Sequence, residues 1–384
     1  MADCGPAGAG TSLVCLPGLC GLPGACIGLS LQPLSESLMG ARKHRILKTW
    51  LLNRRSQSKV LAAHRVTVDQ PMILISQVSR SGGTLLKELL DGHPQLWVMH
   101  RGLKFSRRRW PTPDLTKSLS QWWQQCHRGD KLAEDYRYGF TKKYNEDRPL
   151  PFLFNAPAQK RLFRNLLGQQ PPAGRRDVWN AYLSSYFSAW MDYQQRYSEP
   201  KAGVVNFSSW VMLFDDNVAE FFADYPDGRL IQIVRQPVSW CASVNKQGRK
   251  AYDKTTFQSP ETALPWWQFN TQGVLRNKKQ YGERIVVLDF DGLVRNTQHS
   301  MQMLSKALGI SYHPHMLTPT MNGMQILANS SFAIDQHGVQ ESTSRRDSEF
   351  DQETLALIEK ETSELWREVS SHSINQMPVP HESQ

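Results

Sequence analysis

The stretch from residue 71 to residue 94 constrains the fold of this chain more than any other, because its periodicity changes within a few residues. Met72 to Ile75 is an uninterrupted apolar run, which predicts a buried strand. Ser76 to Gly83 is polar and ends in two glycines, and from Thr84 the leucines recur at helical spacing. The stretch therefore predicts a strand, a short loop and a helix, as in α/β proteins.

The loop in this stretch has the composition of an anion-binding site. Loop N–H groups and the positive end of a helix dipole can converge on an anion at such a position. Gly82 and Gly83 allow the backbone to approach closely, Arg80 adds positive charge, and Thr84 adds a hydroxyl in the first helical turn. An ordinary strand-turn-helix connection without a ligand is the alternative that the spacing alone leaves open.

The nucleotide loop of ordinary NTPases, GxxxxGK[ST], is absent from this stretch. Its lysine follows a longer loop bounded by glycines, whereas here the loop is short and its cation precedes the glycines. This order argues against ATP or GTP hydrolysis.

A second strand-turn-helix pattern follows in the middle of the chain. Leu230 to Val234 is strongly apolar and runs directly into RQPVSWCASV, with Arg235, Pro237 and Ser243. Such a segment delivers a cation and hydroxyl groups to the edge of a parallel sheet where ligands bind. By itself this signal is weak, but it gains weight from following the first loop in order.

Together these segments resemble two motifs of the sulfotransferase family. SRSGGTLLKELLDGHP is similar to the family's 5′-phosphosulfate loop, PRSGTTLL followed by a helix and a His-Pro pair, with Ser79 where the family usually has proline. RQPVSWCASV is similar to its 3′-phosphate segment, Arg-x-Pro followed by Ser. The resemblance implies 3′-phosphoadenosine 5′-phosphosulfate (PAPS) as donor, and no metal. The residues that it implies for the donor are Arg80, Ser81, Gly82, Gly83 and Thr84 at the 5′ end, and Arg235 and Ser243 at the 3′-phosphate.

The resemblance also suggests catalytic residues after a short predicted strand, Leu96 to Met99. His100 stands where tyrosylprotein-type sulfotransferases hold a glutamate base, and an imidazole can take a hydroxyl proton near neutral pH. Lys104 would stabilise the leaving oxygen, beside Arg80. A polar strand end is the alternative for His100. The glutamate of related bacterial enzymes is absent near Gly102, which leaves open a nucleotide-binding protein without catalysis.

Two later segments also match the family. PTMNGMQILANSSF is similar to the NG…NSSF segment of bacterial sulfotransferase-like proteins, which implies that Ser330 and Ser331 bind the nucleotide from a closing loop. DFDGLV is similar to the family's Tyr-Glu-Asp-Leu segment. We predict that its Asp289 and Asp291 are turn and capping groups rather than catalysts.

Composition divides the chain into regions. Arg42 to Arg65 carries eight Lys or Arg residues and no acid, with apolar residues at helical spacing. It predicts a basic amphipathic helix that contacts a membrane surface or a partner, or a surface helix that leads into the core. The predicted regions are a flexible Gly/Pro/Cys-rich tail at 1–40, a basic lead-in at 41–69, an α/β domain at 70–370, and a C-terminal tail at 371–384.

Within the predicted domain, residues 110–200 are rich in aromatic residues and predict a helical insertion that covers the acceptor side. Arg175 to Tyr197 predicts one helix, and Pro149 to Pro172 predicts a link between helices. The aromatic side chains would stack on an acceptor or form ordinary packing between helices.

Charge and cysteine content bound the partners and the compartment. A formal charge of +10 suits anionic ligands, and equally nucleic acid or anionic lipid, so charge alone does not choose between them. We predict no nucleic-acid partner. Only Cys126 and Cys241 lie outside the tail, which favours a reducing, cytoplasmic location, with membrane association as the alternative.

These observations predict an α/β fold, a P-loop-like parallel sheet flanked by helices. The predicted activity is transfer of a sulfuryl group from PAPS to a hydroxyl or amine of a carbohydrate, lipid or small molecule. A P-loop kinase or NTPase, and an inactive nucleotide-binding protein, are the alternatives.

Overall fold

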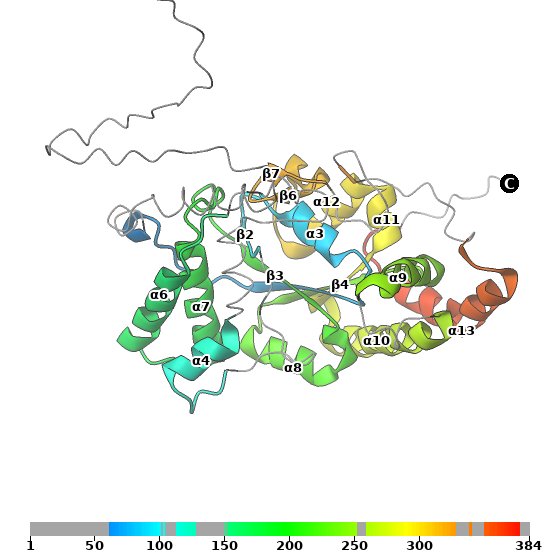
Figure 1. Ribbon diagram of the computed structural model, residues 1–384, viewed down its shortest axis with the longest axis horizontal. Coiled ribbons are helices and arrows are strands. Elements are labelled where there is room, and N and C mark those ends of the chain that lie inside the picture. The colour runs from blue at the N-terminus through cyan, green and yellow to red at the C-terminus, as the bar shows by residue number, and fades with distance from the viewer. Residues whose placement is uncertain are drawn as a thin grey trace, which may run out of the picture.

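The computed structural model describes residues 61–100, 103, 113–127, 150, 152–251, 259–327, 338–339 and 349–376, without the side chains of 246–251. A central parallel sheet has helices on both faces, with α3 and α12 on one side and α8 and α10 on the other (Figure 1). The predicted tail at residues 1–40 and most of the basic lead-in lie outside the described residues.

The five-stranded sheet has the order β2-β3-β1-β4-β5, and every neighbouring pair in it is parallel. Each strand is almost wholly buried and apolar, as expected for a parallel sheet covered on both faces. The predicted α/β fold is therefore confirmed. The strands are β1 (Met72–Gln77), β2 (Leu96–Val98), β3 (Gly203–Ser209), β4 (Arg229–Val234) and β5 (Ile285–Asp289).

Helices follow the strands and cover the sheet. On one face lie α3 (Gly83–Leu90), α11 (Phe290–Arg295) and α12 (Thr297–Leu308). The other described helices are α4 (Leu119–Cys126), α6 (Ala156–Gln169), α7 (Arg175–Ala189), α8 (Asp215–Asp224), α9 (Pro237–Ala251), α10 (Pro260–Tyr281) and α13 (Gln352–Ser371). Short 3₁₀ turns, η1 (Val211–Leu213), η2 (Gly282–Arg284) and η3 (Pro314–Leu317), and a hairpin of β6 (Thr320–Met321) and β7 (Met324–Gln325) complete the list.

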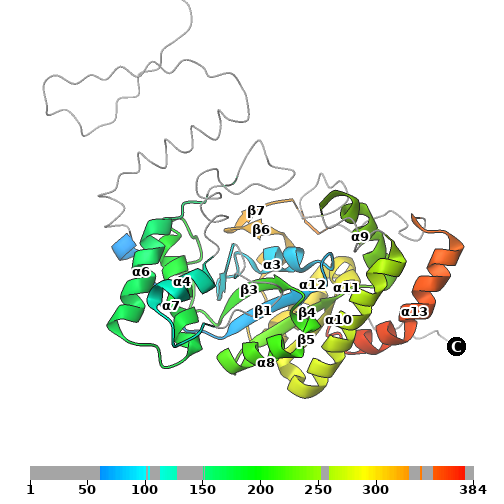
Figure 2. The ribbon, with the colours of Figure 1, turned by 60° about the horizontal axis from the view of Figure 1, so that its bottom comes forward.

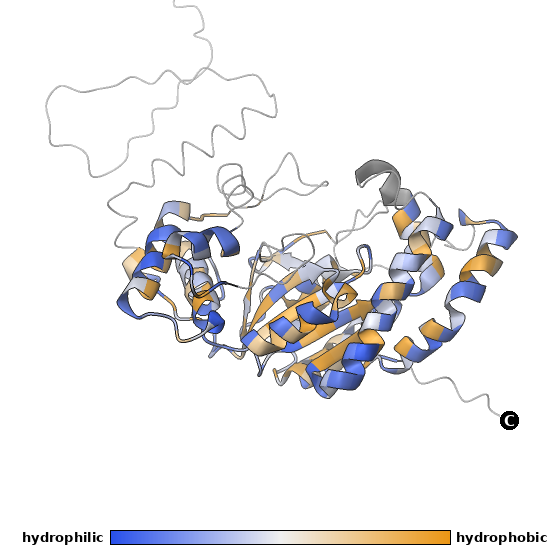
Figure 3. Cartoon of the chain, turned by 90° about the horizontal axis from the view of Figure 1, so that it is seen from below, coloured by the Kyte–Doolittle hydropathy of each residue, from blue (hydrophilic) through white to orange (hydrophobic). Residues whose placement is uncertain are grey.

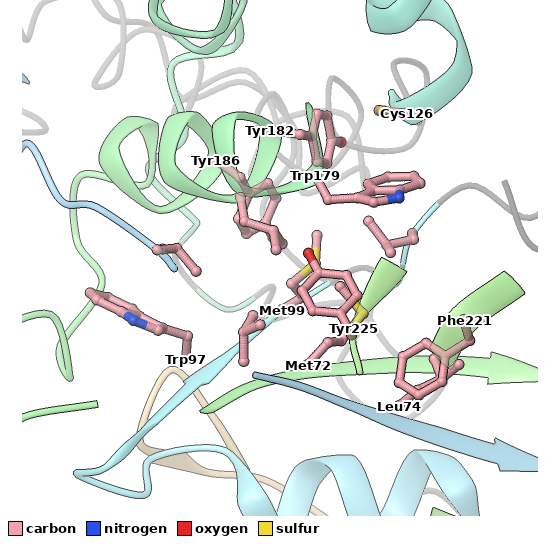
Figure 4. Close-up of a cluster of buried hydrophobic side chains, with 14 of the residues drawn as sticks. Met72, Leu74, Trp97, Met99, Cys126, Trp179, Tyr182, Tyr186, Phe221 and Tyr225 are labelled. Atoms are coloured by element: carbon pink, nitrogen blue, oxygen red, sulfur yellow. The ribbon is translucent and has the colours of Figure 1, made fainter. Parts of the chain in front are cut away.

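Alternating side chains of the strands build two separate cores. Ile73 and Ile75 of β1 pack with the leucines of α3, while Met72 and Leu74 point to the opposite face. On that face they meet aromatic residues of α7 and α8, including Tyr186 and Phe221 (Figure 4). Coloured by hydropathy, the strands form the most apolar part of the fold (Figure 3).

The region predicted as a helical insertion contains α4, α6 and α7, which lie at the end of the molecule opposite α13 (Figure 2). Its described aromatic side chains are mostly core: Trp123, Phe163 and Tyr182 are buried and contact one another. The packing alternative therefore holds for these residues.

Two boundaries in this region differ from the prediction. The helix expected to run to Tyr197 ends at Ala189, because Trp190 leaves the helix to form an antiparallel bridge with Phe154. The expected link from Pro149 to Pro172 contains α6, which Asn155 caps by accepting a hydrogen bond of 2.9 Å from the N–H of Ala158.

The C-terminal boundary also differs. Residues after α13 were predicted as a free tail, yet Ser373 forms a parallel bridge with Val287 of β5. The N–H of Ile374 donates to the carbonyl of Val287, and Asn375 is buried. These contacts cover part of the outer edge of β5, which is the last strand of the sheet.

Within the described part of the chain, no helix combines the length and the apolar character needed to cross a membrane. The two described cysteines, Cys126 and Cys241, are buried free thiols.

Candidate active site

The loop between β1 and α3 turns sharply at Arg80 and Gly82. Arg80 and Gly82 both adopt positive φ angles, 78° and 99°, and the N–H of Ser81 donates to the carbonyl of Val78 at 3.2 Å. A Cβ atom on Gly82 would lie 2.1 Å from the ring of Phe290, so only glycine fits there. The loop thus forms a tight turn that leads directly into the N-terminus of α3.

Glycine is needed at position 83 for a different reason. Its N–H donates to the side-chain oxygen of Gln77 at 2.5 Å, and a Cβ atom would lie 2.5 Å from the ring of Phe207. A side chain at position 83 would therefore clash with Phe207. The bond from Gly83 to Gln77 links the first residue of α3 to the last residue of β1. Thr84 follows, partly exposed, in the first turn of the helix.

The second predicted segment lies against this loop. Arg235 directly follows β4, which pairs with β1, and its guanidinium Nη1 donates to the carbonyl of Arg80 at 2.7 Å. Trp240, in the first turns of α9, donates from its indole to the carbonyl of Ser79 at 2.9 Å. Two segments far apart in the sequence are therefore held together by side-chain bonds to consecutive loop carbonyls.

A third turn, between β5 and α11, completes the arrangement. Phe290 packs under the guanidinium of Arg235, with 4.5 Å from the central carbon to the ring centroid, and also contacts the Gly82 position. The carboxylate of Asp291 accepts a hydrogen bond of 3.2 Å from the N–H of Gln236. The turns after β1, β4 and β5 thus meet at the carboxyl edge of the sheet, where ligands bind in open parallel sheets.

Asp289 is the N-cap of α11, as predicted, whereas Asp291 lies in the first turn of that helix and bonds to the turn after β4. The carboxylate of Asp289 accepts hydrogen bonds from the N–H groups of Asp291 and Gly292, at 3.1 and 3.0 Å. Burial, together with the neighbouring charge of Asp291, raises the pKa of Asp289 to about 6.

His100 follows β2, at the same edge of the sheet as the loop but two strands away from β1. Two strand spacings amount to about 10 Å. The His100 side chain is 5% exposed, and its ring lies 4.8 Å from that of Phe152 and 6.2 Å from that of Trp190, centroid to centroid. His100 therefore packs against two aromatic rings.

Two buried or partly buried polar groups hold the backbone around His100. The amine of Lys87, on α3, donates to the carbonyl of His100 at 2.7 Å. The side-chain oxygen of Asn206, on β3, accepts from the N–H of Leu103 at 2.9 Å. His100 is thus tied to the helix that begins at the loop, and Leu103 to the strand beside β1.

Of the remaining predicted residues, one lies further from the loop and three lie outside the described residues. Ser243 is buried on α9, about 9 Å along the helix from Pro237 at 1.5 Å per residue. Lys104, Ser330 and Ser331 lie outside the described residues. Among the described ranges, no group of three or more His, Cys, Asp or Glu side chains is arranged to hold a metal ion.

Several residues that organise this edge were not singled out from the sequence. Asn206 carried a readable signal, because it interrupts an otherwise apolar strand, and Gln77 stands directly before the loop. Trp240 and Phe290 carried no such signal, because their loop contacts are 161 and about 208 residues away in sequence.

Comparison with known protein families identifies the family of this chain. Residues 71–314, more than half of the chain, match the sulfotransferase family. The chain belongs to the sulfotransferase family. Its match begins at the residue before β1 and includes all three turns that meet at the site. A search among curated proteins found no match.

Several solved sulfotransferase structures are similar to this chain at low identity. The sulfotransferase domain of the Synechococcus PCC 7002 olefin synthase shares 15% identity, over 82% of this chain and 98% of that one, with a TM-score of 0.38. A sulfotransferase from Alicyclobacillus acidocaldarius shares 14%, over 79% and 97%, with a TM-score of 0.37. Retinol dehydratase, solved in a complex with retinol and PAP, shares 12%, over 82% and 86%, with a TM-score of 0.33. The family assignment rests on the sequence match and not on these scores.

Proposed function

We propose that this protein transfers a sulfuryl group from PAPS to a hydroxyl or amine of an acceptor molecule. Family membership supports sulfuryl transfer in general. The observation that carries the proposal for the donor is the position of Arg235, whose guanidinium lies 2.7 Å from the carbonyl of Arg80 in the loop. One nucleotide with phosphate at both its 5′ and 3′ positions fits two neighbouring cationic turns.

In this proposal the loop holds the 5′-phosphosulfate. Arg80 supplies charge, and Ser81 and Thr84 supply donors at the N-terminus of α3, where the helix dipole favours an anion. Arg235 and Ser243 hold the 3′-phosphate, which ATP lacks, and so select PAPS. A second layer keeps Arg235 in place, since Phe290 stacks on its guanidinium and Trp267 donates to its carbonyl at 3.2 Å.

His100 is the proposed base. It takes the proton of the acceptor hydroxyl or amine as the acceptor atom bonds to sulfur, and the bond from sulfur to the phosphate oxygen breaks. Lys104 would stabilise the charge on that oxygen, and 3′-phosphoadenosine 5′-phosphate (PAP) leaves. The buried rings of Phe152 and Trp190 pack beside His100 and make the surroundings of the proposed base apolar, which favours an acceptor with an apolar or sugar face. We therefore propose a carbohydrate, a lipid or a small molecule as acceptor.

A cytoplasmic location is part of the proposal. The free thiols of Cys126 and Cys241 fit a reducing compartment.

A transfer screen tests the function. Purified protein and PAPS labelled with radioactive sulfur would be incubated with glycans, lipids, small alcohols, amines and peptides. We expect label in at least one acceptor class, and a fall in turnover of about 100-fold or more for His100→Ala, with PAP affinity little changed. PAP binding without transfer to any acceptor would favour the inactive nucleotide-binding alternative. Magnesium-dependent consumption of ATP would favour a kinase.

A further inference from the structure

Helix α6 lies at the end of the molecule away from α13 (Figure 2), and three of its exposed residues are cations, with a fourth cation on the neighbouring 61–65 segment. Lys160, Arg161 and Arg164 project from the exposed side of α6, and Arg65 lies exposed on the segment beside them. We call these four side chains the α6 basic face. Among the residues that the structure describes, no carboxylate lies within ion-pair distance of any of them.

In contrast, the first two arginines of the next helix, α7, form ion pairs within the fold. Arg175 pairs with Glu220 at 2.6 Å and with Asp224 at 2.5 Å. Arg176 pairs with Asp227 at 2.8 Å. These arginines are neutralised by carboxylates within the fold, whereas the four cations of the α6 basic face have no such partner among the residues that the structure describes.

Apolar side chains border the α6 basic face. A groove of about 220 Å³ separates the 61–65 segment from α6, and Leu61, Arg65, Arg161, Leu162 and Asn165 line it. Leu166, one turn after Leu162, is 43% exposed. At this groove the cations Arg65 and Arg161 therefore lie beside Leu61, which is buried, and Leu162, which is half-buried.

The segment that carries Arg65 is fixed to the body of the domain. The N–H groups of Val66 and Val68 donate to the hydroxyls of Ser188 and Ser184 on α7, at 3.0 and 2.8 Å. The guanidinium of Arg196 also donates to the carbonyl of His64. Because α6 packs on the same helix α7, Arg65 and the α6 cations keep a fixed relative position.

We propose that the α6 basic face docks the protein on a membrane surface that contains anionic lipids. Cations attract the lipid phosphates and carboxylates, while the exposed Leu166 enters the boundary between headgroups and acyl chains. A nucleic acid would use the cations but gain nothing from Leu166. The sequence leading to Leu61 favours the same partner, since residues 42–60 carry seven further Lys or Arg and no acid. This proposal is independent of the proposed function.

Vesicle flotation with the full chain tests the proposal. We expect the protein to bind vesicles of phosphatidylcholine with 30% phosphatidylserine, and to bind pure phosphatidylcholine weakly. The double variant Arg161→Glu/Arg164→Glu should lower the partition coefficient by about tenfold or more. The neutral pair Arg161→Gln/Arg164→Gln should lower it less. High salt should weaken binding of the wild type.

A matched control separates the α6 basic face from net charge. Lys279→Glu/Lys306→Glu makes the same charge change at exposed positions on α10 and α12. It should change the partition coefficient by less than about twofold, and all variants should keep the wild-type Tm and PAP affinity. Equal losses for both charge-reversal pairs, or equal binding of the wild type to both vesicle types, would overturn the proposal. So would a loss for the α6 variants that appears on duplex DNA and not on vesicles.

Discussion

At the scale of single residues, the loop is held in a conformation that its own sequence does not favour. Arg80 has a φ angle of 78°, a region that costs a residue with a side chain about 1–2 kcal/mol. The bond from Arg235 to its carbonyl, and that from Trp240 to the carbonyl of Ser79, hold the turn in place. Backbone strain of this kind occurs often at functional sites, which agrees with the proposed role of Arg80 in binding the donor.

This strain leads to a prediction for two substitutions of Arg80. Both Arg80→Ala and Arg80→Gly remove the guanidinium, so both should weaken PAP binding by about tenfold or more. Only glycine accepts the positive φ without cost, so Arg80→Gly should be more stable than Arg80→Ala by about 1 kcal/mol. Urea unfolding and calorimetry measure the two effects. Equal stability of both variants would mean that the loop is not strained at this position.

The raised pKa of Asp289 predicts a dependence of stability on pH. The pKa of Asp289 is about 6 in the folded state and near 3.8 in the unfolded state. The folded state therefore binds the proton more tightly, and its stability increases as the pH falls from 7 towards 4. Asn can keep the cap but cannot titrate. The wild type should therefore gain about 1 kcal/mol relative to Asp289→Asn between pH 7 and pH 5.

Urea unfolding at pH 5, 6 and 7 measures this difference. Asp216→Asn removes an exposed carboxylate from the first turn of α8 and is the control for loss of charge. A difference between the wild type and Asp289→Asn that stays constant over this range would contradict the assigned burial of the carboxyl.

At the scale of elements, the sequence predicted those parts of the fold that depend on local pattern. The strands β1 and β4 were found to within two residues, because each is a strongly apolar run that leads into a polar turn. Helix α6 was missed because prolines at both ends of its region indicated a link. Pro157 in fact lies in the first turn, where a helix accepts proline.

The same distinction applies to the site. The loop and the Arg-x-Pro turn were found because each carries its chemistry within ten residues. The contacts of Lys87 with His100, and of Asn206 with Leu103, depend on how β2, β3 and α3 lie relative to one another. A pattern along one segment does not contain that information.

These ties predict that Lys87 is a positioning residue for His100. Lys87→Met keeps the length of the side chain but removes the bond to the carbonyl of His100, so we expect turnover to fall by about tenfold with PAP affinity within about twofold. Lys87→Arg keeps a donor and should recover much of the turnover. A purely structural role would instead lower stability and affect both variants equally in the transfer assay.

At the scale of the whole molecule, five parallel strands bring three distant turns to one edge. The turns after β1 and β4 supply the two cationic segments, and the turn after β5 supplies Phe290 between them. The C-terminal residues Ser373 and Asn375 bond to the backbone of Asp289, so the end of the described chain also supports this third turn. The site therefore depends on the complete fold and not on one motif.

The most direct test of this arrangement is calorimetry of Arg235→Ala with two nucleotides, PAP and the same nucleotide without its 3′-phosphate. Arg229, on the same strand β4 at its opposite end, gives the matched control Arg229→Ala. We predict that Arg235→Ala weakens PAP binding by about 10- to 100-fold more than it weakens binding of the nucleotide without the 3′-phosphate, and that Arg229→Ala changes neither. Equal losses for both nucleotides would contradict the assignment of Arg235 to the 3′-phosphate, and with it the proposal of PAPS as the donor.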